Sequence, residues 1–590
     1  MKQSKYIILS LFALIILFSA CDDDFLELYP QDEISSATYF KHTNDLILYA
    51  NQFYPRVFND FTDGNENSGW NQGIWGIEVN SDNMIYATGP DNRLNGNNVV
   101  PTSGGGWDYS LIRDVNYGIE NYKKCEDNFD DYKHYVGEYY FFRALEYFEL
   151  VKKFGDVPLI TRTITPESEG LYAPKDPRTA VVNQILSDLD SAALLMNSGR
   201  NEGATRLSKE VALAYKSRIA LYEGTWEKYH AGGPFAGSTD GSGFLQQAAD
   251  AAEAVIKSGA YNIYSTGNPS QDYFDMGVQI DYSNNSEVII WKKYDLDQAF
   301  VHHHSVASRR PSNRGVNKSL ADSYLSTDGL PRSVSPIFDE QLLDTTGLYE
   351  AEHLDLRFYQ SIVSPNAVWA IDGNDVITWG DNRHGSPMSK HQCQVIAGKW
   401  GWTTPSGYTK RKGFSPQIEI WSGWSNENFG TVFMRYAEVL LNYAEAKAEL
   451  GTLSQADIDV SINLLRNRVA MPAMDINNLV NDPNWGFPGL TPQINEVRRE
   501  RRVELAFEGL RLDDILRWAA ADELIVGKRP KGVLYLNGSP AVSVDENNYV
   551  DYFQGALGNG YGFNLGRDYL NAIPTEQLTL NENLTQNPGW

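Results

Sequence analysis

Apolar side chains recur at helical spacing along much of this chain, and the spacing is clearest between His134 and Phe154. Hydrophobic residues follow one another there at intervals of three and four, which places them on one face of an amphipathic helix. Gly155 stands where a helix is commonly capped, and Pro158 prevents the helix from continuing. The same pattern predicts further helices over 39–54, 107–122, 178–196, 208–229, 245–258, 433–450, 455–468, 491–508 and 511–524.

Small polar residues and glycines mark where several of these helices begin and end. Ser208 is a suitable N-cap, Gly259 directly follows the helix predicted over 245–258, and Thr491 precedes a proline at the first helical position. The helices form pairs with small, alanine-rich contact faces. This arrangement predicts a helical-repeat layer of the tetratricopeptide type, although the repeat period is poorly kept.

Three stretches lack the helical period and predict a second, irregular half. Residues 59–106 are rich in Asn, Gly and Asp, and we expect long loops there, which often carry function. Turn residues break up 260–430, where Glu287–Trp291 has the composition of a short strand. Residues 525–565 are rich in turns and allow small hairpins. We therefore predict a mostly α-helical fold with few short strands.

The beginning of the chain has the pattern of a lipoprotein signal. Lys2 and Lys5 precede an apolar run from Ile7 to Phe18, which is too short to span a bilayer as a helix. Two small residues then precede Cys21, and the run Phe-Ser-Ala-Cys resembles a lipobox, in which the cysteine is acylated. Such an anchor holds a protein on a membrane without crossing it. The alternative is ordinary secretion with an incidental cysteine.

Charge and composition restrict the class of ligand. Removal of residues 1–20 takes away two lysines and leaves 48 basic against 76 acidic residues, a formal charge of −28. Such a surface repels phosphate polyanions, so we expect no nucleic-acid partner. The 14 Trp and 34 Tyr residues suit contacts with neutral polar ligands. Cys125 and Cys393 remain after lipidation, and whether they pair cannot be deduced from the sequence.

Tryptophans are concentrated in a stretch with weak helical signal. The C–H face of a sugar ring stacks on an indole, while its hydroxyls require amide, carboxylate or guanidinium partners nearby. Each single indole there has a core position as its alternative. The stretch contains Trp369, Trp379, Trp400, Trp402, Trp421 and Trp424, with Asp372, Asn374, Asp375, Asn382 and Arg383 among them.

Several segments, in order, resemble the SusD/RagB family of surface nutrient-binding lipoproteins. The segment Ile494–Trp518, with its Glu-Arg pairs and Phe507-Glu-Gly-Leu-Arg511, is the strongest match. Trp590 departs from the family pattern, since Tyr is common there. The other matching segments are Cys21–Pro30, Tyr139–Leu159, Ala321–Pro331, Met434–Ala446, Ala572–Glu576 and Asn587–Trp590.

The resemblance implies a SusD-like fold, in which four helix pairs of the tetratricopeptide type pack against an irregular, loop-rich half. It implies a signal peptide over 1–20, a lipidated tether over 21–35, an N-terminal helical region over 36–260 and a C-terminal region over 261–590. The last two form one integrated fold.

The resemblance also implies a location and partners. It places the protein on the outer membrane, lipid-anchored and facing the cell exterior, as the lid of a SusC-like TonB-dependent transporter. Family members bind glycans, oligosaccharides or, in the RagB branch, peptides, and perform no chemistry. The density of Trp favours a glycan, while a peptide ligand and a purely structural lid remain alternatives.

The resemblance also suggests which residues contact the ligand, because loops at 70–107 contribute to the family's ligand site. Trp107 has the buried start of a helix as an equal alternative. The full set of candidates is Trp70, Asn71, Trp75, Asp82, Arg93, Trp107, Trp369, Trp379 and Arg383, with Cys21 as the lipidation site.

Signals for catalysis and for cofactors are weak. The sequence has no G-x-S-x-G, H-E-x-x-H, C-x-x-C or Walker pattern, although folding can assemble paired carboxylates, so a surface glycoside hydrolase stays open. His302–His304 have no third ligand at diagnostic spacing, and we expect loop histidines. The run from Asp63 to Ile74 fails as a calcium loop, because Ser68 and Ile74 replace the required Gly and Glu. We expect no cofactor, while structural calcium elsewhere in the irregular half remains possible.

The charged helix around 496–504 has a structural interpretation. Glu496 with Arg499 and Arg501 with Glu504 are spaced as i,i+3 pairs, each of which stabilises a helix by a few tenths of a kcal/mol. Partly buried Arg–Glu pairs would also determine how neighbouring helices pack.

Overall fold

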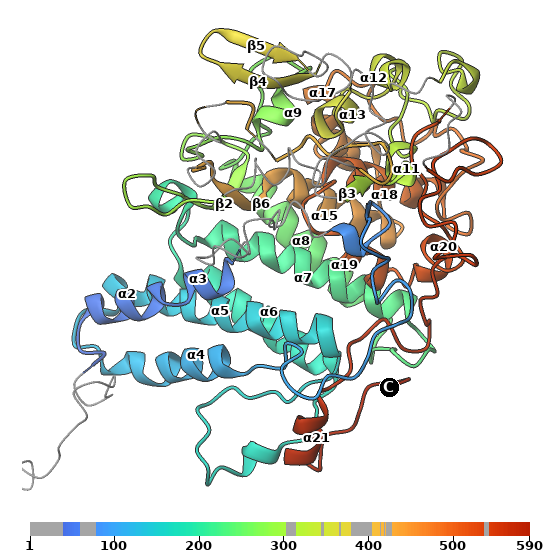
Figure 1. Ribbon diagram of the computed structural model, residues 1–590. Helices are drawn as coiled ribbons and strands as arrows, with labels where there is room; N and C mark the ends of the chain where they lie inside the picture. Colours follow the sequence, from blue (N-terminus) through green and yellow to red (C-terminus); the bar gives the residue numbers. More distant parts are fainter. Residues whose placement is uncertain are drawn as a thin grey trace, which may run out of the picture.

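The computed structural model describes residues 39–59, 78–302, 314–343, 347–364, 367–378, 404–413, 415–417, 419, 427–535 and 542–590. Helices form a layer that runs from α4 through α5, α6, α7 and α8 to α15, with each helix packed on the next (Figure 1). A loop-rich half with short helices and strands covers one side of this layer, at the top of the view. The predicted mostly α-helical architecture with few short strands is confirmed.

The helices of the first part have well-defined ends. Ser208 caps α7 by accepting a hydrogen bond from the Val211 N–H, and Gly259 closes α8 in the left-handed conformation, both as predicted. Helix α5 begins five residues before the predicted start, because Asn128 accepts from the Asp130 N–H and caps it there. The helices are α2 (Thr43–Asn51), α3 (Tyr54–Val57), α4 (Ser110–Asn121), α5 (Phe129–Phe154), α6 (Arg178–Leu195), α7 (Lys209–Tyr229) and α8 (Ser242–Ser258).

Two helices predicted in the later part are interrupted. The helix predicted over 455–468 breaks at Ser461, whose backbone is not helical, and the one predicted over 511–524 breaks at Ala519, whose φ is +50°. Thr491 caps α18 as expected, with Pro492 at its first position. The helices are α15 (Tyr436–Glu449), α16 (Gln455–Asp459), α17 (Ile462–Arg468), α18 (Pro492–Glu504), α19 (Arg511–Arg517), α20 (Ala521–Leu524) and α21 (Thr575–Leu580).

Short elements make up the loop-rich half. In the described part of the chain the strands form three antiparallel pairs, β1–β3, β2–β6 and β4–β5. The predicted strand at 287–291 is confirmed as β2, shifted by one residue. The strands are β1 (Met84–Tyr86), β2 (Val288–Lys292), β3 (Arg314–Val316), β4 (Val368–Asp372), β5 (Asp375–Thr378) and β6 (Thr431–Arg435), and the short α-helices are α9 (Asp272–Asp275), α11 (Lys318–Ala321), α12 (Leu348–His353) and α13 (Arg357–Ser361).

Small residues allow the helices of the layer to approach closely. A Cβ on Gly137 of α5 would lie 2.7 Å from the Met196 side chain, which follows α6. A Cβ on Gly224 of α7 would lie 2.9 Å from the backbone nitrogen of Leu245 in α8. The expected small contact faces therefore exist. The largest hydrophobic core continues from these helices across residue 260 into α15, α17, α18 and α19.

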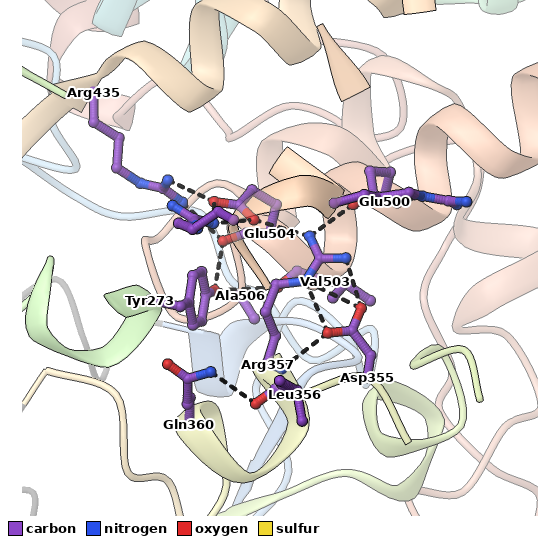
Figure 2. A network of polar contacts seen from close by, with 12 residues as sticks. Tyr273, Asp355, Leu356, Arg357, Gln360, Arg435, Glu500, Val503, Glu504 and Ala506 are labelled. Carbon is purple, nitrogen blue, oxygen red and sulfur yellow. Dashed lines mark hydrogen bonds and ion pairs between the residues drawn. The ribbon is translucent and has the colours of Figure 1, made fainter. Parts of the chain in front are cut away.

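A buried ionic network joins the helical layer to the loop-rich half (Figure 2). Glu504 at the end of α18 accepts from Arg468 at 2.6 Å, from Arg435 at 2.7 Å and from Arg357 at 2.9 Å. Burial alone would raise the pKa of Glu504, but the three guanidinium groups outweigh it and hold that pKa well below its ordinary value. This network shows the helix-positioning role that the sequence suggested for buried Arg–Glu pairs.

One of the two predicted i,i+3 pairs within α18 does not form. Arg499 lies 3.6 Å from Glu496, as expected, but Arg501 turns away from Glu504 and bonds Asp514 at 3.0 Å. Contacts between elements replace the local pair, because three arginines from other segments already surround Glu504.

In the described residues, no helix is long and apolar enough to cross a bilayer.

Candidate ligand-binding site

Residues 78–107, which were expected to be functional loops, contribute to two cavities. Strand β1 anchors the segment by pairing Met84 with Val316 of β3. One cavity, of about 450 Å³, is lined from this segment by Asn80, Asp91–Arg93 and Asn98, and we call it the Asn pocket. The other, of about 490 Å³, is lined by Asp82 together with residues of α18 and of the loops at 482–487 and 528–531, and we call it the Trp485 cleft.

Four asparagines dominate the lining of the Asn pocket. The side chains of Asn80, Asn92 and Asn98 form no hydrogen bond or ion pair within the described residues, whereas Asn571 accepts a hydrogen bond from Arg93. Each free amide offers both donors and acceptors. The remaining lining residues are Asp91, Arg93, Val99, Pro101, Gly105, Leu512, Ala572 and Trp590.

Local hydrogen bonds fix the loop that presents these amides. The Asp91 carboxylate accepts from the Arg93 N–H at 2.9 Å and from the Leu94 N–H at 3.1 Å, which forms an Asx turn. Gly96 follows with φ of +68°, a conformation that glycine adopts without strain, and its carbonyl accepts from Arg567 at 2.7 Å. The loop is therefore held in shape before any ligand arrives.

The opposite wall of the Asn pocket comes from the end of the chain. The Trp590 indole N–H donates to the Leu570 carbonyl at 3.1 Å, and the Arg567 guanidinium lies 4.6 Å from the centre of the Trp590 ring. Asn587 donates to the Asn571 carbonyl at 2.8 Å. Backbone bonds from Thr575 to Pro101 and from Glu576 to Thr102, each 3.0 Å, tie this wall to the loop.

Arg93 bridges the two walls of the Asn pocket. Its guanidinium donates to the Asn571 side-chain oxygen across a sequence separation of 478 residues. Burial lowers the pKa of the Arg93 guanidinium below its ordinary value, with Asp91 among the carboxylates that oppose this shift. A rigid cavity with free amides, one guanidinium and one indole matches the polar groups and flat faces of a sugar.

Asp82 is placed apart from Arg93. It lies in the wall of the Trp485 cleft, where its carboxylate accepts from Arg511 at 2.7 and 2.9 Å and pairs with Arg502 at 2.9 Å. Burial would raise the pKa of Asp82, but the two guanidinium groups outweigh it and hold that pKa at about 2. Its carboxylate is committed to arginines from α18 and α19, so its visible role is structural.

Two predicted tryptophans pack within the protein. Trp107 precedes α4 and is half-buried, with its ring centre 4.9 Å from that of Phe154, and it lines neither cavity. This matches the alternative of a packed position near a helix start. Trp369 lies in β4 and is 8% exposed, which also indicates a packing position. Contact of either indole with a ligand stays a prediction.

The remaining candidates lie outside the described residues, so their assignments stay predictions. They are Cys21, Trp70, Asn71, Trp75, Trp379 and Arg383, and the same holds for Trp400, Trp402, Trp421, Trp424, Cys393, His303 and His304.

His302 is described and is fully buried, with its Nε2 2.8 Å from the Phe429 carbonyl, so it is a core residue and not a loop histidine. Within the described residues, no group of three or more His, Cys, Asp or Glu side chains could hold a metal ion.

Sequence reasoning missed most of the Asn pocket. Asn80, Asn92 and Asn98 belong to the Asn-rich loop that was expected to be functional, so composition gave the region but not the residues. Asn571 and Trp590 gave no such signal, because nothing in the sequence indicates that the two ends of the chain meet. Asn571 lies beside one segment that resembles the family, Ala572–Glu576, and Trp590 ends another, Asn587–Trp590.

Comparison with known proteins supplies the family. A model of the SusD family matches residues 260–590, and a second model, described as starch-binding and associating with the outer membrane, matches residues 24–221. The chain belongs to the SusD family. The two matched parts contribute opposite walls of the Asn pocket, so this SusD-family cavity forms only where both parts meet.

Relatives resemble the chain over nearly its whole length. SusD-like protein P38 of Formosa agariphila is 24% identical over 552 residues, which cover 89% of this chain and 94% of the relative. A crystal structure of a SusD-like protein from Bacteroides fragilis has a TM-score of 0.69 and 22% identity, covering 95% of this chain and all of the other. A SusD-like carbohydrate-binding protein from the same species has a TM-score of 0.68 and 22% identity, covering 93% of this chain and all of the other. These similarities show the SusD-like fold.

Proposed function

We propose that this SusD-family protein binds glycans in the Asn pocket and passes them, unaltered, to a SusC-like TonB-dependent transporter. The observation that carries the proposal is the set of three amide side chains, Asn80, Asn92 and Asn98, that line one rigid cavity and have no partner among the described residues. Unused amides in a preformed pocket suit the hydroxyls of a sugar, which require both donors and acceptors. The solved relative described as carbohydrate-binding supports the same ligand class.

The lining of the Asn pocket supports binding without hydrolysis. Glycoside hydrolysis commonly uses two carboxyl groups on opposite sides of the scissile bond. Asp91 is the sole carboxylate among the described residues that line this pocket, and its Oδ1 already accepts two backbone N–H groups. Incubation with the bound glycan should therefore release no reducing ends.

The proposed location rests on the lipobox and the family. Acylation of Cys21 would anchor the protein to the outer membrane, and the family model matched at 24–221 is described as associating with that membrane. Mass spectrometry of the mature N-terminus tests the lipid directly. Co-purification of the native, membrane-extracted protein tests the transporter, and its absence from the complex would contradict the delivery step.

The ligand itself is tested on the soluble chain that begins after Cys21. A glycan array should identify a ligand, and calorimetry should show that the triple variant N80A/N92A/N98A loses it while circular dichroism stays unchanged. A matched peptide array separates the RagB-type alternative. Binding of peptides alone, or glycan binding that the triple variant leaves intact, would overturn the assignment to this pocket.

A further inference from the structure

The Trp485 cleft has a charge composition opposite to that of the chain. Among the described residues that line it, Lys and Arg number nine and Asp and Glu five, whereas the whole chain has 50 basic and 76 acidic residues. A concave site lined mostly by one sign of charge focuses its field and raises the local concentration of the opposite ion. The lining of the cleft is therefore richer in cations than the chain as a whole.

Two of these cations share a single carboxylate within the lining. Asp82 alone serves both Arg502 and Arg511. Arg502 also donates to neutral groups, namely the Asn83 side-chain oxygen at 2.9 Å and the Ser319 carbonyl at 3.0 Å, while Glu78 and Asp322 act on its charge without a direct bond. Burial lowers the pKa of Arg502 to about 10, which still leaves its guanidinium charged at neutral pH.

The loop at 528–531 adds one cation, Lys528, that no acidic side chain pairs with in the described residues. Arg529 and Lys531 both pair with the buried Asp551, at 2.9 and 2.6 Å, and Lys531 also lies 3.2 Å from Asp545. Lys528 beside them is exposed and forms no side-chain hydrogen bond or ion pair within the described residues. Its ammonium group is a free cation at the cleft.

The cleft also holds an indole and an unused buried donor. Trp485 is partly exposed and is held by a hydrogen bond to Asn481 at 3.0 Å, with the Arg499 guanidinium 5.0 Å from its ring centre. Arg498, also part of the lining, is 2% exposed, and its Nε is buried without a hydrogen-bond partner among the described residues. A flat apolar face in a cleft that also carries the free ammonium group of Lys528 suits a sugar that bears a negative charge.

We propose that the Trp485 cleft is a second binding site, which takes glycans bearing carboxylate or sulfate groups. The sugar face lies on Trp485, and its anionic substituent pairs with Lys528 and the neighbouring cations. The inference rests on the proposed glycan binding for its ligand class. It assigns a separate site with a separate selectivity.

Calorimetry on the full mature chain tests the site with matched ligands. An oligogalacturonate and its fully methyl-esterified form share one backbone and differ in charge, and a carrageenan oligosaccharide with its desulfated form does the same for sulfate. We expect the charged member of at least one pair to bind about tenfold more tightly at low salt, and to lose this advantage at 0.5 M NaCl. Equal affinity within both pairs would overturn the proposal.

Variants locate the site. Lys528→Gln should lower the affinity for the anionic ligand about fivefold, and Lys528→Glu should lower it more strongly. Trp485→Ala should lower the affinity for the charged and the neutral form of each ligand alike. Lys257→Gln, which removes an exposed lysine from α8, is the control and should change nothing. Loss of anion binding in the N80A/N92A/N98A variant, with Lys528 and Trp485 variants unaffected, would overturn the second site and leave the proposed function standing. Absence of any glycan binding would overturn both.

Discussion

The Arg435 guanidinium donates to Glu504 at 2.7 Å, and both side chains are buried to 1% exposure or less. Arg435 is the last residue of β6, where it pairs with Val288 of β2, while Glu504 ends α18, so this contact fixes the loop-rich half against the helical layer. The same carboxylate serves Arg468 and Arg357, which concentrates the stability of that junction in one residue.

Replacement of Glu504 by Gln should therefore be strongly destabilising. It leaves three buried guanidinium groups around a neutral side chain, and loss of one partner in a buried ion pair costs about 3–5 kcal/mol. Urea unfolding measures the change. Glu126→Gln is the control, since Glu126 is 65% exposed in its pair with Lys41 and should cost less than about 1 kcal/mol. Similar losses in both variants would contradict the role given to the network.

Gly224→Ala should destabilise the contact between α7 and α8. The new Cβ would lie 2.8 Å from the Leu245 side chain and 2.9 Å from its backbone nitrogen, and overpacking of this kind costs about 1–3 kcal/mol. Gly243→Ala, within α8, is the matched control because its Cβ would meet nothing within 4 Å. That change should be neutral or slightly stabilising in thermal unfolding. A neutral Gly224→Ala would show that the helices can separate without cost.

Asp82 should make the stability of the protein depend on pH in the acid range. Its pKa of about 2 in the folded state lies below the ordinary value, so its contribution is full above pH 4 and is lost as pH falls toward 2. The shift corresponds to about 2 kcal/mol. Asp82→Asn should lower the free energy of unfolding at pH 7, and the difference from the wild type should shrink below pH 4. A difference that stays constant with pH would contradict this pairing.

Asn98→Ala should weaken glycan binding without loss of stability. Asn98 lines the Asn pocket and has no hydrogen-bond partner in the described residues, so its removal costs a ligand contact alone, roughly threefold to tenfold in affinity. Asn262→Ala removes another partner-free amide, this one exposed and outside the pocket, and should leave affinity unchanged. Calorimetry and thermal unfolding together separate the two effects. A lower melting temperature in Asn98→Ala would indicate a structural role instead.

Binding in the Trp485 cleft should strengthen as the pH falls through 7. Burial and the adjacent Asp522 raise the pKa of Glu523 in the cleft lining to about 7, while Arg498 opposes the shift. Protonation of Glu523 removes a negative charge that repels an anionic ligand. Affinity for oligogalacturonate should therefore rise between pH 8 and pH 6, and Glu523→Gln should abolish this trend. A pH trend that survives in the variant would assign it to another group.

The sequence predicted helices better than it predicted the site. Periodicity located α5 and α7, and the N-cap residues Ser208 and Thr491 marked the starts of α7 and α18, because both signals act over a few residues. The prediction of an Arg501–Glu504 pair was wrong because partners from distant segments surround Glu504. The Asn pocket was hidden for the same reason, since its walls come from opposite ends of the chain.

The bridge from Arg93 to Asn571 has a consequence for assembly. The pocket wall that carries Asn571 must dock onto the loop that carries Arg93, 478 residues earlier in the chain. A molecule in which residues 571–590 are displaced would lack this wall of the cavity. Any ligand that contacts both walls can therefore bind only after these two distant segments have come together in the folded chain.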